Sequence, residues 1–93
     1  MQAGGGSAEH PSMSDEMARA VARAIRAERS RVGISQDELA ARLGVARSVV
    51  TAMEQGRRRV AIDEMPELCE ALGVGLNVLL WGAPAEDLRK LGL

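Results

Sequence analysis

The stretch Ile34–Arg59, ISQDELAARLGVARSVVTAMEQGRRR, decides the fold of this 93-residue chain. It predicts a helix capped by Ser35, with Glu38 three residues later in the position of a capping box. Gly44 ends that helix, because the tight turn needs a residue that accepts positive φ without a Cβ penalty. A second helix follows over about residues 46–55. The pair has the layout of a helix-turn-helix, whose second helix enters the major groove of DNA.

The composition favours an all-α fold. Hydrophobic residues make up 46% of the chain, yet Phe and Tyr are absent and Trp81 is the single aromatic residue. The core must therefore come from Ala, Val, Leu, Ile and Met, which suit closely packed helices better than a sheet. Period-two runs of β-branched residues are missing as well. A chain of this length fits one small domain.

Charge is distributed unevenly along the chain, although the net charge is only −1. Residues 19–59 carry ten arginines against four acidic residues, a net +6, whereas residues 1–18 carry −3 and residues 60–93 carry −4. A basic middle between acidic flanks can bind phosphates while the whole chain stays near neutral. The alternative is that several of these arginines only solvate a helix surface.

The segment before the motif predicts another helix. Ser14 is expected to cap it and Gly33 to end it. Its apolar residues recur at helical spacing and define a stripe that faces the core. The stripe consists of Met17, Val21, Ala24, Ile25 and Val32.

The segment after the motif predicts two helices and the start of a third. Met65, Leu68, Cys69 and Leu72 are spaced i, i+3, i+4 and i+7, which marks a helix from about residue 63 to 72. Pro66 is tolerated because it falls in the first turn. A short fifth helix is expected over residues 76–81, and a short sixth one after Pro84.

The expected organisation is a disordered tail (1–13), a helix-turn-helix DNA-binding domain (14–82) and a short C-terminal helical extension (83–93). No apolar run reaches the ~18 residues of a membrane span, and the N-terminus lacks signal-peptide features. We therefore expect a cytoplasmic protein without membrane association. The single histidine, His10, lies in the tail, so neither a metal nor a cofactor is predicted. Cys69 is expected to be a buried, inert thiol.

Residues from about Ile25 to Trp81 resemble the XRE family, the lambdoid phage repressor type of helix-turn-helix. The resemblance rests on SQDELAARLGV, on the following helix with its closing EQGRRR, and on PELCEALGVGLNVLLWG. These pieces occur in order, at the spacing of the family, over more than half the chain. The resemblance implies a five-helix domain that binds double-stranded DNA as a dimer on near-palindromic operators.

The resemblance also implies roles for single residues. Gln36, at the start of its helix, matches a glutamine that flanks phosphates or bases, and Arg29 and Glu54 match an ion pair that ties the first helix to the recognition helix. Relatives often carry Ser or Thr where Ala46 stands, so the recognition helix lacks a side-chain cap, a loss of ~1 kcal/mol. Contacts with bases are expected from Arg47, Ser48, Thr51 and Ala52.

Helix geometry supports these assignments independently. Val50 and Met53 share the inner face, whereas the predicted contact residues lie on the other sides. An arginine such as Arg47 can donate two hydrogen bonds to a guanine, and we prefer this role to phosphate binding. For Ser48 and Thr51, phosphate contact is about as plausible as base contact. Phosphate contacts are expected from Gln36, Gln55, Arg57, Arg58 and Arg59.

The C-terminal region predicts a homodimer contact. Its leucines exceed what a domain of this size is expected to cover by itself, and Trp81 can lie at the same seam. The residues expected at this contact are Leu79, Leu80, Trp81, Leu88 and Leu91.

The sequence therefore predicts a sequence-specific regulator of transcription, most simply a repressor that occupies a promoter. The alternative is an antitoxin or another regulatory protein that grips a protein partner with its C-terminal segment. An enzyme is not expected, because the sequence offers no nucleophile–base pair, metal cluster or phosphate-binding loop.

Overall fold

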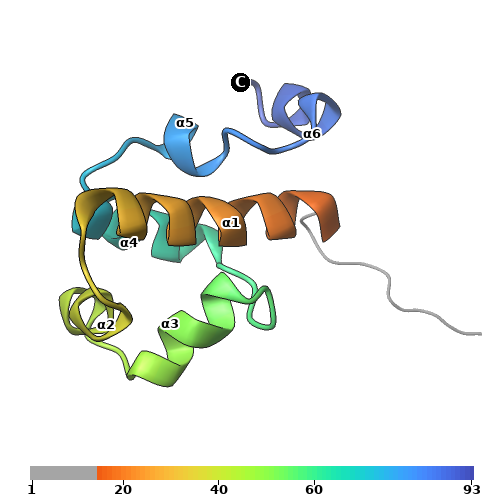
Figure 1. Ribbon diagram of the computed structural model, residues 1–93. Helices are drawn as coiled ribbons and strands as arrows, with labels where there is room; N and C mark the ends of the chain where they lie inside the picture. The colour runs from red at the N-terminus through yellow and green to blue at the C-terminus, as the bar shows by residue number, and fades with distance from the viewer. Residues whose placement is uncertain (1–14) are drawn as a thin grey trace, which may run out of the picture.

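A long first helix, α1 (Asp15–Val32), runs through the middle of the molecule and contacts helices on both sides (Figure 1). The computed structural model describes residues 15–93. The expected cap at Ser14 and the tail with His10 lie outside the described residues. In the view of Figure 1, α2 and α3 lie below α1, and α5 and α6 lie above it.

Five further α-helices follow, and the part of the chain that the structure describes contains no strand, so the all-α prediction is confirmed. Each helix is short because a glycine or a turn ends it within one to three turns. The elements are α2 (Gln36–Leu43), α3 (Arg47–Glu54), a 3-10 turn (Ile62–Glu64), α4 (Met65–Leu72), α5 (Leu76–Leu79) and α6 (Ala85–Lys90).

The apolar stripe of α1 forms the centre of the core. Val21 and Ile25 are almost completely buried, and Met17 is covered as well. The stripe ends earlier than predicted, since Val32 keeps 38% of its surface exposed at the end of the helix. The other fully buried large side chains come from the four helices α2 to α5: Leu39, Val50, Leu68, Leu72 and Leu79.

The turn between α2 and α3 has the predicted geometry. Gly44 adopts φ of 70°, the left-handed conformation that glycine accepts without a Cβ penalty. At the other end of α2, the Ser35 hydroxyl accepts a hydrogen bond from the Glu38 amide (3.0 Å), which is one half of the predicted capping box. The Glu38 carboxylate accepts a hydrogen bond from Arg42 Nη2 (3.1 Å).

The start of the fourth helix differs from the prediction. The chain forms a 3-10 turn at Ile62–Glu64, and α4 begins at Met65, two residues after the predicted start at Asp63. Pro66 has no N–H to donate to the carbonyl of Ile62, so an α-helical bond is impossible there. The turn closes with a bond from the Met65 N–H to the Ile62 carbonyl.

Candidate nucleic-acid interface

Helix α3 presents the predicted base-contact residues on one side. Arg47 and Ser48 are exposed, and Thr51 and Ala52 are half-buried. At 100° per residue these four positions span roughly 140° of the helix surface. The opposite side holds Val50 and Met53, which are 0% and 3% exposed. The outer face of α3 is therefore available for an external ligand.

The ion pair expected between Arg29 and Glu54 is present, and it fastens the end of α3 to α1. Arg29 Nε donates to Glu54 Oε2 (2.6 Å), and Nη2 donates to Oε1 (3.1 Å). Nη1 of the same guanidinium donates to the Ile34 carbonyl (2.9 Å), so one side chain joins α1, α3 and the segment before α2. The hydrogen bond to Glu54 raises the pKa of Arg29 above its ordinary value, against the opposing effect of burial.

Gln36 connects this ion pair to the outer face of α3. Its Nε2 donates to Glu54 Oε1 (2.9 Å). Its Oε1 accepts hydrogen bonds from Thr51 Oγ1 (2.9 Å) and, at a longer 3.4 Å, from Arg47 Nε. Residues that the sequence assigned to bases, to phosphates and to an ion pair thus meet in one hydrogen-bonded group.

The first turn of α3 begins without a side-chain cap, as Ala46 predicts. Ala46 has φ of −74° and ψ of 153°, the extended conformation of an N-cap residue, but makes no side-chain cap hydrogen bond. Amides at a helix N-terminus that lack a cap attract anions, because several N–H groups and the helix dipole point the same way.

The loop after α3 holds three arginines with different surroundings. Arg57 is exposed, and its Nε donates to Gln55 Oε1 (2.8 Å), so these two predicted phosphate contacts lie together. Arg58 donates through Nη1 and Nη2 to Glu64 Oε1 and Oε2 (3.1 and 2.6 Å). Arg59 pairs with Asp15 at the start of α1. Two of the three guanidinium groups are thus engaged with carboxylates of the domain itself.

Pairing with Arg58 changes the acidity of Glu64. The hydrogen bond from Arg58 holds the pKa of Glu64 below its ordinary value, and a backbone hydrogen bond from the Ala61 amide (2.8 Å) acts in the same direction. Hydrogen bonding to Glu64 in turn raises the pKa of Arg58. This pair closes the loop against the 3-10 turn, so Arg58 has a structural role that the sequence did not predict.

Two of the residues predicted for the dimer contact are buried in their own domain. Leu79 and Leu80 are 0% and 3% exposed, because α5 packs against α1 and α4, and this part of the prediction is wrong. Leu88 is half-buried against the core. Trp81 and Leu91 keep 87% and 54% of their surface exposed. Helix α5 also ends at Leu79, earlier than predicted.

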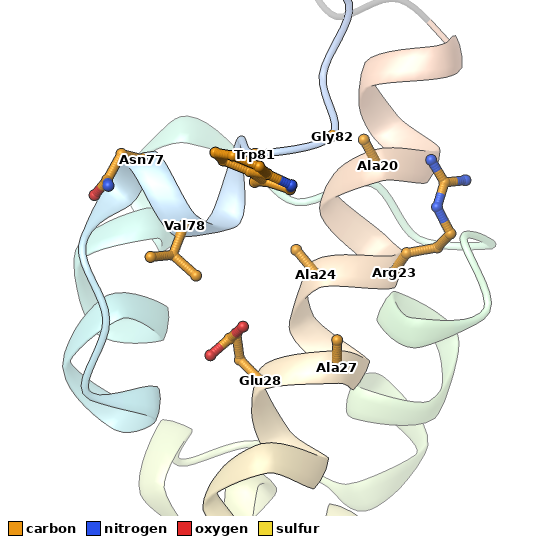
Figure 2. Close-up of a pocket in the computed structure, with 9 residues that line it drawn as sticks. All are labelled: Ala20, Arg23, Ala24, Ala27, Glu28, Asn77, Val78, Trp81 and Gly82. Carbon is orange, nitrogen blue, oxygen red and sulfur yellow. The ribbon is translucent and has the colours of Figure 1, made fainter.

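Trp81 lies at the edge of a groove of about 400 Å³ between α1 and α5 (Figure 2). Ala20, Ala24 and Ala27 follow one another along the α1 side, and Val78 lies across from them. Ala20 and Arg29 are nine residues apart, which is two and a half helical turns. The groove and the contact with the recognition helix are therefore on opposite faces of α1.

Other interactions of the fold were not predicted from the sequence. Arg42 Nη1 donates to the Ala71 carbonyl (2.8 Å) and so links α2 to the end of α4.

Cys69 is half-buried, and burial raises the pKa of its thiol. Among residues 15–93, no helix is long and apolar enough to cross a membrane, and no group of three His, Cys, Asp or Glu side chains could hold a metal ion.

Comparison with known proteins agrees with this geometry. An uncharacterized HTH-type transcriptional regulator of Methanothermobacter thermautotrophicus is 39% identical over 49 residues, which are 53% of this chain and 71% of that protein. Among solved structures, the clp gene regulator ClgR from Corynebacterium glutamicum superposes with a TM-score of 0.68 at 28% identity. The match covers 72% of this chain and 86% of ClgR.

A second solved structure is also similar. The restriction-modification controller protein C.AhdI from Aeromonas hydrophila has a TM-score of 0.61 and 31% identity, covering 66% of this chain and 92% of that protein. The family model described as helix-turn-helix matches residues 25–79, which include α2, the turn and α3. The chain belongs to the XRE-type helix-turn-helix family and has the DNA-binding fold of its transcriptional regulators.

Proposed function

We propose that this protein binds one specific double-stranded DNA sequence in the cytoplasm and regulates transcription there as a repressor. The observation that carries the proposal is the outer face of α3, where Arg47 and Ser48 are exposed while Glu54 is fastened to α1 by two hydrogen bonds from Arg29. A helix held in this way loses little conformational freedom on entering a groove. In this proposal the protein is a binder and not a catalyst, and residues 14–82 form its DNA-binding domain.

Base readout is assigned to Arg47, with Ser48, Thr51 and Ala52 beside it. An exposed guanidinium near the N-terminus of α3 can donate two hydrogen bonds to O6 and N7 of a guanine. The methyl groups of Thr51 and Ala52 can contact the methyl group of a thymine. Thr51 uses its hydroxyl hydrogen within the domain, because that hydroxyl donates to Gln36.

Phosphate contacts are assigned first to Gln55 and Arg57, which lie together just after α3 and are exposed. Arg58 and Arg59 can contribute positive charge to the same strand while they remain paired with Glu64 and Asp15. Gln36 begins α2, and a helix N-terminus is a favourable site for a phosphate. These contacts position the protein on the duplex without reading its sequence.

A homodimer on a palindromic operator is the proposed form of the complex. Trp81, Leu91 and the groove between α1 and α5 offer exposed apolar surface for the contact, and the half-buried Leu88 is a further candidate. Two-fold symmetry of the protein then matches two-fold symmetry of the DNA site. Because the groove lies on the face of α1 opposite Arg29, a second copy bound there leaves both recognition helices uncovered.

A partner-binding function is the second candidate. The same groove with its 87% exposed Trp81 favours it, since an exposed tryptophan beside a groove is typical of a protein interface. An antitoxin or similar regulator would hold a protein partner there while α3 remains free for DNA. Stoichiometric co-purification with one small protein, lost in Trp81→Ala, would support this candidate.

Selection of bound sequences from a random pool of duplex DNA tests the main proposal. The expected result is enrichment of one short palindrome whose half-sites are ~10 bp apart, one helical turn. Cloned upstream of a reporter promoter, that site should lower transcription when the protein is expressed. A pool that remains random after repeated selection would contradict sequence-specific binding.

A further inference from the structure

A continuous series of hydrogen bonds leads from α1 to the outer face of α3, and we call it the Gln36 network. Arg29 donates to Glu54, Gln36 donates to Glu54, and both Thr51 and Arg47 donate to Gln36. The carboxylate of Glu54 is nearly buried, with 3% of its side chain exposed. One end of the network is thus inside the domain and the other end is at the proposed DNA surface.

The order of donors and acceptors fixes the orientation of the Gln36 amide. An ionised carboxylate can only accept hydrogen bonds, and Glu54 accepts three of them, from Arg29 Nε, Arg29 Nη2 and Gln36 Nε2. The Gln36 nitrogen therefore has to face Glu54. Its oxygen then faces the other way, where it meets the hydroxyl of Thr51 and the Nε–H of Arg47.

We infer that Glu54 is a positioning residue for base readout, and that it acts by setting the orientation of the Gln36 amide. This inference rests on the proposed function, since it names what determines specificity at the same site. With Gln36 Oε1 accepting from Nε, the guanidinium of Arg47 keeps its two Nη groups for a guanine. The hydroxyl of Thr51 is turned inward by the same oxygen, so Thr51 presents its methyl group to DNA.

A second acceptor lies near Arg47 and has to be considered in any test. Asp37 Oδ1 is 3.9 Å from Arg47 Nε, and the Asp37 side chain is 73% exposed. At this distance the carboxylate attracts the guanidinium without fixing which of its N–H groups points where. In this inference the direction of the Arg47 guanidinium is therefore set by Gln36 and not by Asp37.

The substitution Glu54→Gln tests the inference because it replaces one acceptor oxygen by an NH2 donor. If the remaining oxygen stays with Arg29 Nε, the new NH2 group takes the place of Oε1 and faces two donors, Arg29 Nη2 and the NH2 group of Gln36, and donors cannot bond to each other. The Gln36 amide then inverts and points its NH2 group at Arg47. The preference for one base pair in a DNA selection should fall by ~5-fold or more, the low end of what a bidentate arginine provides.

A double substitution should restore the preference. In Gln36→Glu with Glu54→Gln, the amide of residue 54 donates to the new carboxylate, whose other oxygen accepts from Thr51 and Arg47. The total charge equals that of the unmodified protein. Overall affinity for DNA falls because a carboxylate lies near phosphates, but the base preference should return to within ~2-fold of the original.

Glu64→Gln is the matched control. Glu64 also accepts three hydrogen bonds, two from Arg58 and one from the Ala61 amide, but it has no link to Gln36. This variant should keep the base preference of the unmodified protein. If Glu54→Gln does not fold, Gln36→Met gives the same loss of preference while the Arg29–Glu54 pair stays intact.

A measurement without DNA separates this inference from the proposed function. ¹⁵N relaxation of Arg47 Nε should report greater mobility in Glu54→Gln than in the unmodified protein, and a return in the double variant. Unchanged base preference in both Glu54→Gln and Gln36→Met, or a lost preference that the double variant fails to restore, overturns the inference. If the unmodified protein selects no DNA sequence at all, the proposed function is wrong. The ¹⁵N relaxation of Arg47 then still tests whether Glu54 sets the orientation of the Gln36 amide.

Discussion

Arg58 and Glu64 form a two-pronged ion pair, with Nη1–Oε1 and Nη2–Oε2 distances of 3.1 and 2.6 Å. The pair spans the loop between α3 and α4 and lies in the middle of the arginine run that follows the recognition helix. One of the three guanidinium groups for which the sequence predicts phosphate contacts therefore holds the loop together. Its contribution to folding and its contribution to DNA binding can be separated experimentally.

The Arg58–Glu64 pair predicts a pH-dependent difference between the protein and Arg58→Ala. Because pairing lowers the pKa of Glu64 in the folded state, its stabilisation is fully present above the ordinary value of 4.5 and is lost as the pH falls through the lower folded pKa. The side chains are 41% and 31% exposed, so solvent screening limits the effect to ~0.5–1 kcal/mol at pH 7. Urea unfolding of both proteins at pH 7 and at pH 3 measures it. An equal difference at both pH values would exclude Glu64 as the titrating partner.

Arg57→Ala should weaken DNA binding without affecting stability. Its guanidinium is exposed and bonds only to Gln55 among the interactions described, so its removal costs little in the folded protein. The slope of log K against log salt should become shallower by ~0.9 if Arg57 neutralises one phosphate. Fluorescence anisotropy over a series of salt concentrations gives this slope. A slope that stays the same would show that Arg57 does not reach the backbone.

Arg47→Ala should relax the sequence preference at one base pair. Loss of a bidentate contact should lower the binding free energy by ~1–3 kcal/mol for DNA with the preferred base pair, and by much less for DNA with another base pair there. The control is Arg26→Ala, which removes the same charge from an exposed position of α1. Both variants are compared by DNA selection and by competition binding. Base readout by Arg47 would be ruled out if the two variants kept identical preferences.

Ala46→Ser should stabilise the domain by ~1 kcal/mol. Ala46 already has the extended backbone of an N-cap residue, so a serine hydroxyl can accept a hydrogen bond from the first turn of α3 without rearrangement. Ser35→Ala, at the cap that α2 already has, should destabilise by a similar amount. Ala41→Ser, exposed in the middle of α2, serves as the control and should lower stability slightly. Urea midpoints rank the four proteins.

Leu79 and Trp81 are expected to respond in opposite ways to alanine substitution. Leu79→Ala empties a fully buried position and should cost ~2–5 kcal/mol of unfolding free energy. Trp81→Ala removes a side chain that is 87% exposed, so monomer stability should change by less than ~0.5 kcal/mol. Sedimentation velocity should instead show weaker self-association. A Trp81→Ala protein that associates as before would move the dimer contact elsewhere.

Local signals made most of the fold predictable. Gly44 and the cap at Ser35 act within a few residues, so their sequence pattern is sufficient to place α2 and the turn. Pro66 correctly indicated that a helix starts nearby. Because Pro66 has no N–H, however, α4 begins two residues later than predicted. The Arg29–Glu54 pair, 25 residues apart, was predicted only through resemblance to a family, since spacing alone does not bring distant side chains together.

The remaining contacts depend on tertiary packing. Asp15 and Arg59 are 44 residues apart, and nothing in either segment indicates that they meet. The leucines near the C-terminus show the same limit: periodicity identifies apolar residues, but not which of them their own domain covers. Leu79 and Leu80 are buried because α5 folds back onto α1, whereas Trp81, the next residue, is exposed to solvent.

The two sides of α1 contact different parts of the protein. Arg29 on one side determines how the recognition helix is held, and Ala20, Ala24 and Ala27 on the other side line the groove. Substitutions at well-separated sites without shared partners act nearly additively. If the groove is the proposed protein interface, a larger residue at Ala24 or Ala27 should alter association there, and with it the half-site spacing of a dimer, while the base preference within one half-site stays the same. The proposed interface and the proposed base contacts could in this way change independently, although both depend on one helix.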